Sequence, residues 1–193
     1  SYSLLSPPQR TGLYELGIER LDDGEVSTWF HDKAQHGETI EVLGPVGGHF
    51  VLDESNTRPA LLIGGGSGVV PLLSMAAQRV GAYSQAHTTL LVAARHLDEV
   101  LLWPTLQRWE AFTPRFRSRL ALSRDTCAPR AQDHVGRIDG ADVAWALQQL
   151  GDVATESAQV FICGRNDFVE SIVHMVTGLN MPEVSIRTER FGS

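Results

Sequence analysis

The sequence predicts two folds in succession: a partial antiparallel β-barrel, then a parallel β-sheet covered by helices on both faces. Three observations support this. Short alternating runs separated by turns fill residues 12–53, a polar stretch follows from Asp53 to Pro59, and apolar runs then alternate with helical stretches. The chain has 193 residues, 42% of them hydrophobic and 20% charged, which is enough for two small domains. We place the domains at residues 1–56 and 57–193.

The first part, residues 1–56, has the sequence pattern of antiparallel β-structure. Apolar and polar residues alternate over Tyr14–Ile18 and again over Thr39–Leu43, and Asp22-Asp23-Gly24 marks a turn between them. A short helix is predicted over Ser27–Gln35, with Ser27 as its N-cap. Two or three strands cannot close a barrel. We therefore expect either that partner strands precede Ser1 in the natural protein or that this segment folds against another chain.

The second part has the pattern of a parallel α/β sheet. The predicted strands are Ala60–Ile63, Leu90–Ala94, Arg119–Ser123, Gln159–Cys163 and Val184–Arg187, and the predicted helices are Pro71–Val80, Trp103–Phe112, Ala141–Leu150 and Phe168–Leu179. Strands that alternate with helices in this way form a sheet buried on both faces. Ligands of such sheets bind at the carboxyl ends of the strands, so functional residues are expected directly after each strand.

Composition excludes several classes of protein. The net charge of -7 argues against a nucleic-acid surface, although arginines gather between residues 108 and 137. Cys127 and Cys163 are too few for a disulfide scaffold or a four-thiolate cluster, and no metal site is predicted. The longest clean apolar run, Leu90–Ala94, ends at Arg95, so no membrane span is predicted. The N-terminus lacks the features of a signal peptide, and we expect a cytoplasmic protein.

The strongest local signal is a glycine-rich loop between a buried strand and a helix that begins near Pro71. Its residues are Gly64, Gly65, Gly66, Ser67, Gly68 and Val69. Glycines let the backbone approach a pyrophosphate, and the amides at the start of the helix favour its negative charge. The loop departs from G-x-G-x-x-G because Val69 takes the place of the third glycine, and it lacks the lysine of a P-loop. A glycine-rich turn alone could equally be structural.

Further motifs accompany this loop in a fixed order. They are Ser1-Tyr2-Ser3, Gly24-Glu25-Val26-Ser27, Gly44-Pro45-Val46-Gly47-Gly48-His49-Phe50, Phe161-Ile162-Cys163-Gly164 and Glu189-Arg190-Phe191-Gly192. Together they resemble the ferredoxin-NADP reductase family, and most of all its stand-alone bacterial FAD-binding oxidoreductases and the reductase modules of oxygenases. The resemblance covers nearly the whole chain. It implies an arginine directly before Ser1, and so a barrel whose first half lies upstream of this numbering.

The resemblance implies an activity. A bound FAD, or FMN in its place, would take hydride from NADPH or NADH and release electrons singly to a separate acceptor such as ferredoxin, another iron–sulfur protein or an oxygenase. Two alternatives remain: a non-catalytic electron-transfer or regulatory subunit, and a nucleotide-binding module without flavin. A nucleic-acid binder conflicts with the overall acidity.

The resemblance also implies roles for residues on the flavin side. Tyr2 would pack against the isoalloxazine ring, and the Ser3 hydroxyl would hydrogen-bond near its N5. Gly24, Val26 and Ser27 would hold the flavin phosphates at a helix N-terminus, where Ser27 could instead serve only as a cap. Ile18 and Arg20 match the strand that runs along the flavin, and Arg20 could meet a phosphate.

Other residues are implied on the nicotinamide side. Cys163 would lie beside the nicotinamide C4, with Gly164 in the turn after it, although a buried thiol can also be purely structural. Glu189 matches the family's terminal acidic residue, and Phe191 would cover the flavin until nicotinamide displaces it. The implied catalytic set is Ser3, Cys163, Glu189 and Phe191. The family's Cys-Gly-Pro is here Cys163-Gly164-Arg165, which leaves the rigidity of this turn open.

Coenzyme choice depends on the ends of the second and third strands of the sheet. An acidic residue after the second strand usually binds the ribose hydroxyls of NADH, but here that strand ends in Arg95. Ser123 and Arg124 end the third strand and resemble the Ser-Arg pair that meets the 2′-phosphate in NADP-dependent relatives. These residues favour NADPH over NADH.

Overall fold

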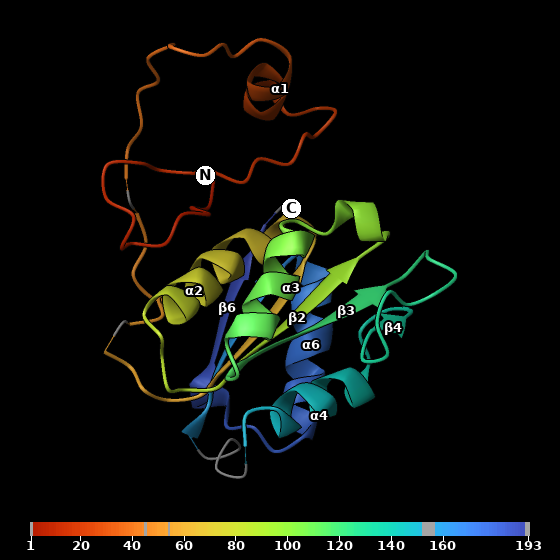
Figure 1. Ribbon diagram of the computed structural model, residues 1–193. Coiled ribbons are helices and arrows are strands. Elements are labelled where there is room, and N and C mark those ends of the chain that lie inside the picture. The colour runs from red at the N-terminus through yellow and green to blue at the C-terminus, as the bar shows by residue number, and fades with distance from the viewer. Residues whose placement is uncertain (1, 45, 54, 152–156, 192–193) are drawn as a thin grey trace.

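A computed structural model describes all residues except 1, 45, 54, 152–156 and 192–193. Its centre is a six-stranded parallel sheet with the strand order β4-β3-β2-β1-β5-β6 (Figure 1). The strands are β1 (Ala60–Gly65), β2 (Thr88–Ala94), β3 (Phe116–Leu122), β4 (His134–Val135), β5 (Gln159–Gly164) and β6 (Ile186–Arg190). The predicted parallel sheet is therefore confirmed.

The sheet is buried on both faces because its central strands are almost continuously apolar. In β1, Leu62 packs into a core on the face that also holds Leu72 and Phe116. Its neighbours Leu61 and Ile63 point to the opposite face. All three β1 residues are fully buried. Alternate side chains of one strand thus supply two separate cores, as expected for a sheet between two helical layers.

Four helices cover the sheet: α2 (Val69–Gly81), α3 (Trp103–Phe112), α4 (Gly140–Gln148) and α6 (Asn166–Gly178). Figure 1 shows α2 and α3 together on one face, with α4 and α6 on the other. Each was predicted from its apolar pattern, with ends that differ by one to two residues. Single 3-10 turns, η1 (Gly66–Gly68), η2 (Leu97–Glu99) and η3 (Glu183–Ser185), follow or precede the strands.

Three strands differ clearly from their predictions. Strand β3, expected over Arg119–Ser123, begins at Phe116 and ends at Leu122. The last strand, expected over Val184–Arg187, begins instead at Ile186 and runs to Arg190, because η3 occupies residues 183–185. Strand β4 was not predicted, since two residues carry no periodic pattern. It pairs only with Ala121 and Leu122 at the carboxyl end of β3.

The N-terminal part, red to orange in Figure 1, extends from the sheet as a long loop that carries helix α1 (Glu25–Asp32). The predicted strands Tyr14–Ile18 and Thr39–Leu43 do not form, and the described residues before Pro59 contain one antiparallel bridge, between Leu4 and Leu16. A strand needs a partner for its backbone groups, and no described segment pairs with Thr39–Leu43, whose Leu43 is 93% exposed.

The start of α1 also corrects a prediction. Gly24, not Ser27, is the N-cap, and Ser27 lies inside the first turn. The Ser27 hydroxyl is buried, accepts a hydrogen bond from Leu21 N at 3.2 Å and donates one to Gly24 O at 3.3 Å. The helix begins earlier because the turn at Asp22-Asp23 closes onto Gly24.

The two parts of the chain touch at several points. Ser74 of α2 donates a hydrogen bond to Ser6 O (2.9 Å), and the Phe50 ring packs edge-to-face on Phe161 of β5, with centroids 5.4 Å apart. Leu52 is buried in the sheet's core. Packing against the sheet thus begins before the predicted boundary at residue 57. Within the described ranges, no helix has the length and apolar character needed to cross a membrane.

Candidate functional site

Three segments meet at the carboxyl edge of the sheet. The register places Gly64 of β1 beside Cys163 of β5, and Cys163 beside Glu189 of β6. Phe191 N then donates a hydrogen bond to Gly164 O at 3.0 Å. The glycine loop, the Cys163-Gly164 turn and the chain end are therefore neighbours, although they are far apart in sequence.

The glycine loop owes its shape to two close contacts and one open position. A Cβ at Gly68 would lie 2.4 Å from Cys163 O, and one at Gly64 would lie 2.9 Å from Val69 Cα. Gly64 thus allows the close contact between helix and strand for which G-x-G-x-x-G uses its third glycine. Gly66 has φ +57, in the left-handed region, and a Cβ there would meet nothing within 4 Å. The loop is therefore packed against the sheet on one side and open on the other, above Gly66.

The predicted site residues of this loop occupy distinct places. Gly65 packs against the Phe168 ring of α6. Ser67 lies in η1, between Gly66 and Gly68. Val69 is the first residue of α2, with Pro71 in the same turn. The amide of Val69, the first of α2, is used by the carbonyls of Gly66 and Ser67, and Pro71 has no N–H. The η1 turn before α2 has no side-chain cap, and a turn start next to open space can bind an anion.

Cys163 is fully buried at the end of β5. Burial, and secondly the charge of Glu189, raise the pKa of its thiol far above the ordinary value, so it stays protonated at physiological pH. The partly buried Glu189 carboxylate forms no hydrogen bond or ion pair with a described residue. Phe191 is partly buried and packs against the core that contains Leu62, Leu72 and Phe161. The group therefore offers a neutral thiol, an unpaired carboxylate and an aromatic ring.

The turn after Cys163 gets its rigidity from packing. A Cβ at Gly164 would lie 2.7 Å from the Phe168 ring, so this ring fixes the turn that proline would otherwise stiffen. Arg165 is the N-cap of α6 and forms an exposed ion pair with Asp167 at 3.5 Å. The Arg165 side chain, which stands where the family has proline, is 83% exposed to solvent.

Arginines follow three neighbouring strands at the same edge. Arg124 N donates to Arg95 O at 2.9 Å, which places the ends of β2 and β3 side by side, and Ser123 N donates to Ala94 O at 3.0 Å. The Arg95 guanidinium is held by Glu99 at 2.8 Å. The exposed Arg124 side chain has no hydrogen bond or ion pair with a described residue.

Arg137 is a third arginine at this edge, and the sequence analysis missed it. It follows β4, and Gly136 N donates to Leu122 O at 3.0 Å, so Arg137 lies next to the end of β3. Its exposed side chain also has no polar partner among the described residues. The signal that could have found it is weak, since it depends on recognising a two-residue strand.

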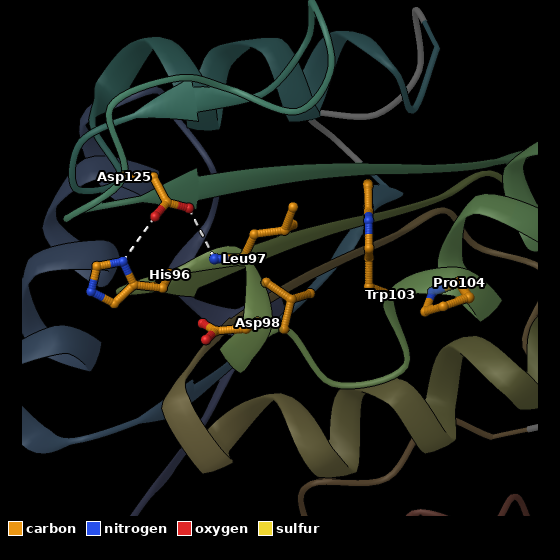
Figure 2. A pocket seen from close by; sticks show the side chains of 7 residues that line it. His96, Leu97, Asp98, Trp103, Pro104 and Asp125 are labelled. Carbon is orange, nitrogen blue, oxygen red and sulfur yellow. Dashed lines mark hydrogen bonds and ion pairs between the residues drawn. The ribbon is translucent and has the colours of Figure 1, made fainter.

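A cavity of about 610 Å³ opens beside these strand ends (Figure 2). Its lining residues are His96, Leu97, Asp98, Val100, Trp103, Pro104 and Asp125. Asp125 is fixed on its rim, because its carboxylate accepts hydrogen bonds from His96 Nδ1 (2.8 Å) and Leu97 N (2.9 Å). Figure 2 shows Trp103 standing at the opposite end of the cavity. An aromatic wall and a polar rim at this place suit a flat, polar ligand.

Comparison with known proteins agrees with this geometry. The family model for the oxidoreductase NAD-binding domain matches residues 62–174, which include the glycine loop, all three arginine-bearing strand ends and the Cys163-Gly164 turn. The chain belongs to the ferredoxin-NADP reductase-like oxidoreductases.

Relatives and solved structures support this family. Ferredoxin–NADP reductase B of Sorangium cellulosum is 28% identical over 99% of this chain, which spans 77% of that protein. A flavohemoprotein of Bacillus subtilis is 29% identical over 99% of the chain, which spans 46% of it. The flavohem-like FAD/NAD binding domain of nitric oxide dioxygenase from Vibrio cholerae has the same fold, with a TM-score of 0.83, 20% identity, and coverage of 100% of this chain and 76% of that one.

The residues that the reductase family would place around a flavin lie in the N-terminal part. The Tyr2 ring is 38% exposed and meets Phe30 of α1 edge-to-face, with centroids 6.0 Å apart. The Ser3 hydroxyl has no hydrogen bond with a described residue. No hydrogen bond or ring contact between described residues joins Tyr2 or Ser3 to Cys163 or Glu189. The structure therefore does not itself unite the two halves of the implied catalytic set.

The implied phosphate contacts are only partly available. Arg20 forms ion pairs with Asp22 and Asp32, each at 3.2 Å, and Ile18 O accepts from His31 Nε2 at 2.9 Å. Ser27 uses its hydroxyl internally, as described above. The start of α1 at Gly24 lacks a side-chain cap, and Val26 is 52% exposed. Backbone amides there could bind a phosphate, whereas the Ser27 hydroxyl is already engaged. Ser1, Pro45 and Gly192 of the implied motifs lie outside the described residues.

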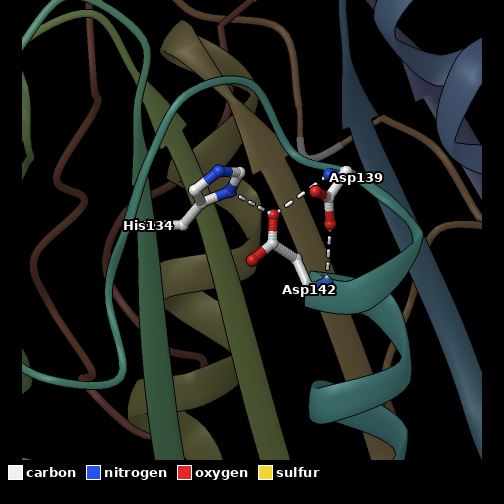
Figure 3. Close-up of side chains that lie close together, drawn as sticks. All are labelled: His134, Asp139 and Asp142. Carbon is white, nitrogen blue, oxygen red and sulfur yellow. Dashed lines mark hydrogen bonds and ion pairs between the residues drawn. The ribbon is translucent and has the colours of Figure 1, made fainter.

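His134, Asp139 and Asp142 bring three potential metal-ligand atoms within 4.8 Å of one another (Figure 3). Each has a structural partner. Asp139 caps α4 by accepting from Ala141 N (2.8 Å), and Asp142 Oδ2 accepts from Asp139 N (3.0 Å) and His134 Nδ1 (2.8 Å). Asp142 Oδ1 pairs with Arg119 at 2.9 Å. The arrangement is a capping box that Arg119 and His134 extend by binding the Asp142 carboxylate.

Proposed function

We propose that this chain is the nucleotide-binding part of a reductase that moves hydride from NADPH to FAD. Electrons would then pass singly to a separate acceptor such as ferredoxin, another iron–sulfur protein or an oxygenase. One observation carries the proposal: the open glycine loop, the Cys163-Gly164 turn and Glu189 meet at one edge of the sheet. We place the reaction in the cytoplasm, a step supported by two unpaired cysteines.

The residues at this edge fit a dinucleotide. The space above Gly66 and the η1 turn, which has no side-chain cap, suit the pyrophosphate. Cys163 and Glu189 would position the nicotinamide ring, the thiol by packing and the carboxylate by accepting a hydrogen bond. Bound coenzyme and flavin would supply the hydride chemistry. On the flavin side, the exposed Tyr2 ring and the start of α1 suit an aromatic ring system and its phosphates, with FMN as the alternative to FAD.

The arginine edge supports NADPH rather than NADH. Arg124 and Arg137 follow adjacent strands, and neither guanidinium group has a partner among the described residues. Arg124 directly precedes Asp125, which lines the cavity that suits adenosine. Two cations can bind a 2′-phosphate through charge-assisted hydrogen bonds. Two carboxylates, Asp98 and Asp125, also line the cavity. Asp125 is held by His96 and the backbone of Leu97, so it lies at the rim in a fixed position.

Replacing Arg124 with alanine is expected to weaken NADPH binding by about 10- to 100-fold, since a charge-assisted hydrogen bond contributes roughly 1.5–3 kcal/mol. NADH binding should change little, because NADH has no 2′-phosphate. Titration of both coenzymes into the variant measures the difference. Arg108→Ala is the control, because Arg108 is an exposed arginine whose one hydrogen bond to a described residue goes to Thr105. Equal losses for both coenzymes in Arg124→Ala would contradict the assignment.

A visible absorption spectrum of the full-length protein tests the proposed function directly. We expect the yellow bands of bound flavin and their bleaching on anaerobic addition of NADPH, with a slower response to NADH. A colourless protein that still binds NADPH would support a nucleotide-binding module without flavin. One observation favours that rival: the Ser27 hydroxyl and Arg20, both implied flavin contacts, are already engaged within the chain.

A further inference from the structure

The β3–β4 loop, residues 123–133, carries Ser123, Arg124 and Asp125 of the proposed coenzyme site. Its beginning is held by backbone hydrogen bonds to Ala94 and Arg95 and by the Asp125 carboxylate. Residues 126–129 are exposed and form no hydrogen bond with a described residue. What fixes the far end of the loop therefore decides how firmly Arg124 is held.

Arg130 supplies that anchor. Its side chain is 15% exposed and contacts Asp133 through two nitrogen atoms, at 2.8 and 2.7 Å. It also pairs with Glu110 of α3 and donates to the Ser118 carbonyl of β3 at 3.3 Å. A planar guanidinium can make all of these contacts at once because its donors point in fixed directions. Arg130 thus joins the loop, α3 and β3 at one point.

The two carboxylates that Arg130 neutralises have a second role. Glu110 accepts a hydrogen bond from Ser118 N at 2.6 Å, and Asp133 accepts one from Leu120 N at 2.9 Å. These amides lie on the outer edge of β3, where the short strand β4 does not reach. Without Arg130, two neighbouring carboxylates, one of them with a wholly buried side chain, would lose their shared cation. The end of the loop would have to move to relieve that cost.

Arg130 also contacts the cavity. Its guanidinium carbon lies 4.5 Å from the centre of the Trp103 ring, the aromatic wall of the cavity. The same side chain therefore holds the wall of the cavity and the loop with the unpaired Arg124.

We propose that Arg130 is a positioning residue for the 2′-phosphate end of the coenzyme. It does not reach the ligand; it holds the β3–β4 loop so that Arg124 can. This inference rests on the proposed function. Loss of the Arg130 guanidinium should reduce the discrimination between ligands with and without a 2′-phosphate.

The test compares Arg130→Lys with wild type in the full-length protein. Lysine keeps the charge but cannot bind two carboxylates in the same fork, so we expect the preference for 2′,5′-ADP over 5′-ADP, measured by calorimetry, to fall by about fivefold or more. The limiting rate of flavin reduction by NADPH should stay unchanged while the half-saturating concentration rises. The fluorescence difference between Arg130→Lys and wild type should disappear when Trp103→Phe is introduced into both.

Arg117→Lys is the matched control, because Arg117 lies on β3 and its guanidinium donates a hydrogen bond to the Phe116 carbonyl at 2.8 Å. If Arg130→Lys does not fold, Glu110→Gln decides the question, since it keeps the acceptor for Ser118 N and removes the ion pair. Unchanged discrimination, or equal weakening of both probes, would overturn the role of Arg130 alone. A wild-type protein that binds neither probe would overturn the proposed function as well.

Discussion

A Gly66→Asn variant is expected to fold normally and to lose at least about 100-fold in affinity for NADPH and NADH, the cost of about two charge-assisted hydrogen bonds at roughly 1.5–3 kcal/mol each. Gly66 is the open position of the glycine loop, with a left-handed φ of +57. Asparagine tolerates this conformation better than other residues with a side chain. Its side chain would therefore occupy the space proposed for the pyrophosphate without forcing the loop apart.

Gly12→Asn is the control for this experiment. Gly12 also has a left-handed φ, +79, with nothing within 4 Å of a Cβ, but it lies outside the glycine loop. Thermal unfolding should show similar small changes for both variants, and only Gly66→Asn should fail to bind coenzyme in a calorimetric titration. Gly68 is unsuitable for this purpose, because its Cβ would collide with the β5 backbone and test packing instead. Wild-type coenzyme affinity in Gly66→Asn would refute the assignment of the loop.

The sheet domain could be predicted from sequence because strands that are buried on both faces must be apolar at nearly every position. β1 and β5 are short apolar runs followed by glycine turns, and the helices between the strands carry apolar stripes. The outer edge of β3 has no such sequence pattern. There the carboxylates of Glu110 and Asp133 accept hydrogen bonds from β3 amides, in place of the carbonyl groups of a neighbouring strand. A hydrogen bond from a distant carboxylate has no period that the sequence could reveal.

The candidate site was predicted unevenly for a related reason. Residues at the ends of long strands, such as Cys163 and Arg124, could be placed by the rule that ligands bind at the carboxyl edge. Arg137 was missed because its strand is too short to recognise. Motif resemblance gave Ser27 and Arg20 roles without showing their local partners. In the structure, partners within the chain would compete with a flavin phosphate for these groups. The backbone of Leu21 and Gly24 binds the Ser27 hydroxyl, and Asp32 binds Arg20.

The flavin-side strands were predicted from alternation alone, which is necessary for a half-buried strand but does not supply a partner. Val42 is 72% exposed, so the side chains expected to face a barrel interior face solvent in this structure. The alternation of apolar and polar residues in Thr39–Leu43 thus indicated a tendency to form a strand, but it could not show whether another strand would pair with it. In the parallel sheet, by contrast, each predicted strand finds its partner within the same chain.

The hydride-transfer step is expected to slow by about 100-fold in Glu189→Gln and in Cys163→Ala, since misplacing reacting groups by about 1 Å can cost this much. Both side chains lie at the end of adjacent strands, where they would hold the nicotinamide ring against the flavin. The thiol is kept neutral by burial, so its proposed role is to fill space beside the ring. Coenzyme affinity should change little, because the pyrophosphate and the 2′-phosphate would be bound elsewhere.

Stopped-flow flavin reduction in the full-length protein measures this step, with Ser3→Ala and Phe191→Ala testing the remaining members of the implied set. Cys127→Ala and Glu170→Gln serve as controls, because Cys127 is exposed and Glu170, among the described residues, accepts from Asn166 alone, at 3.1 Å. We expect Phe191→Ala to bind coenzyme faster, since the ring would no longer have to move. If Glu189→Gln and Cys163→Ala both reduce flavin at the wild-type limiting rate with saturating NADPH and NADH, the carboxyl edge binds coenzyme without positioning it for transfer.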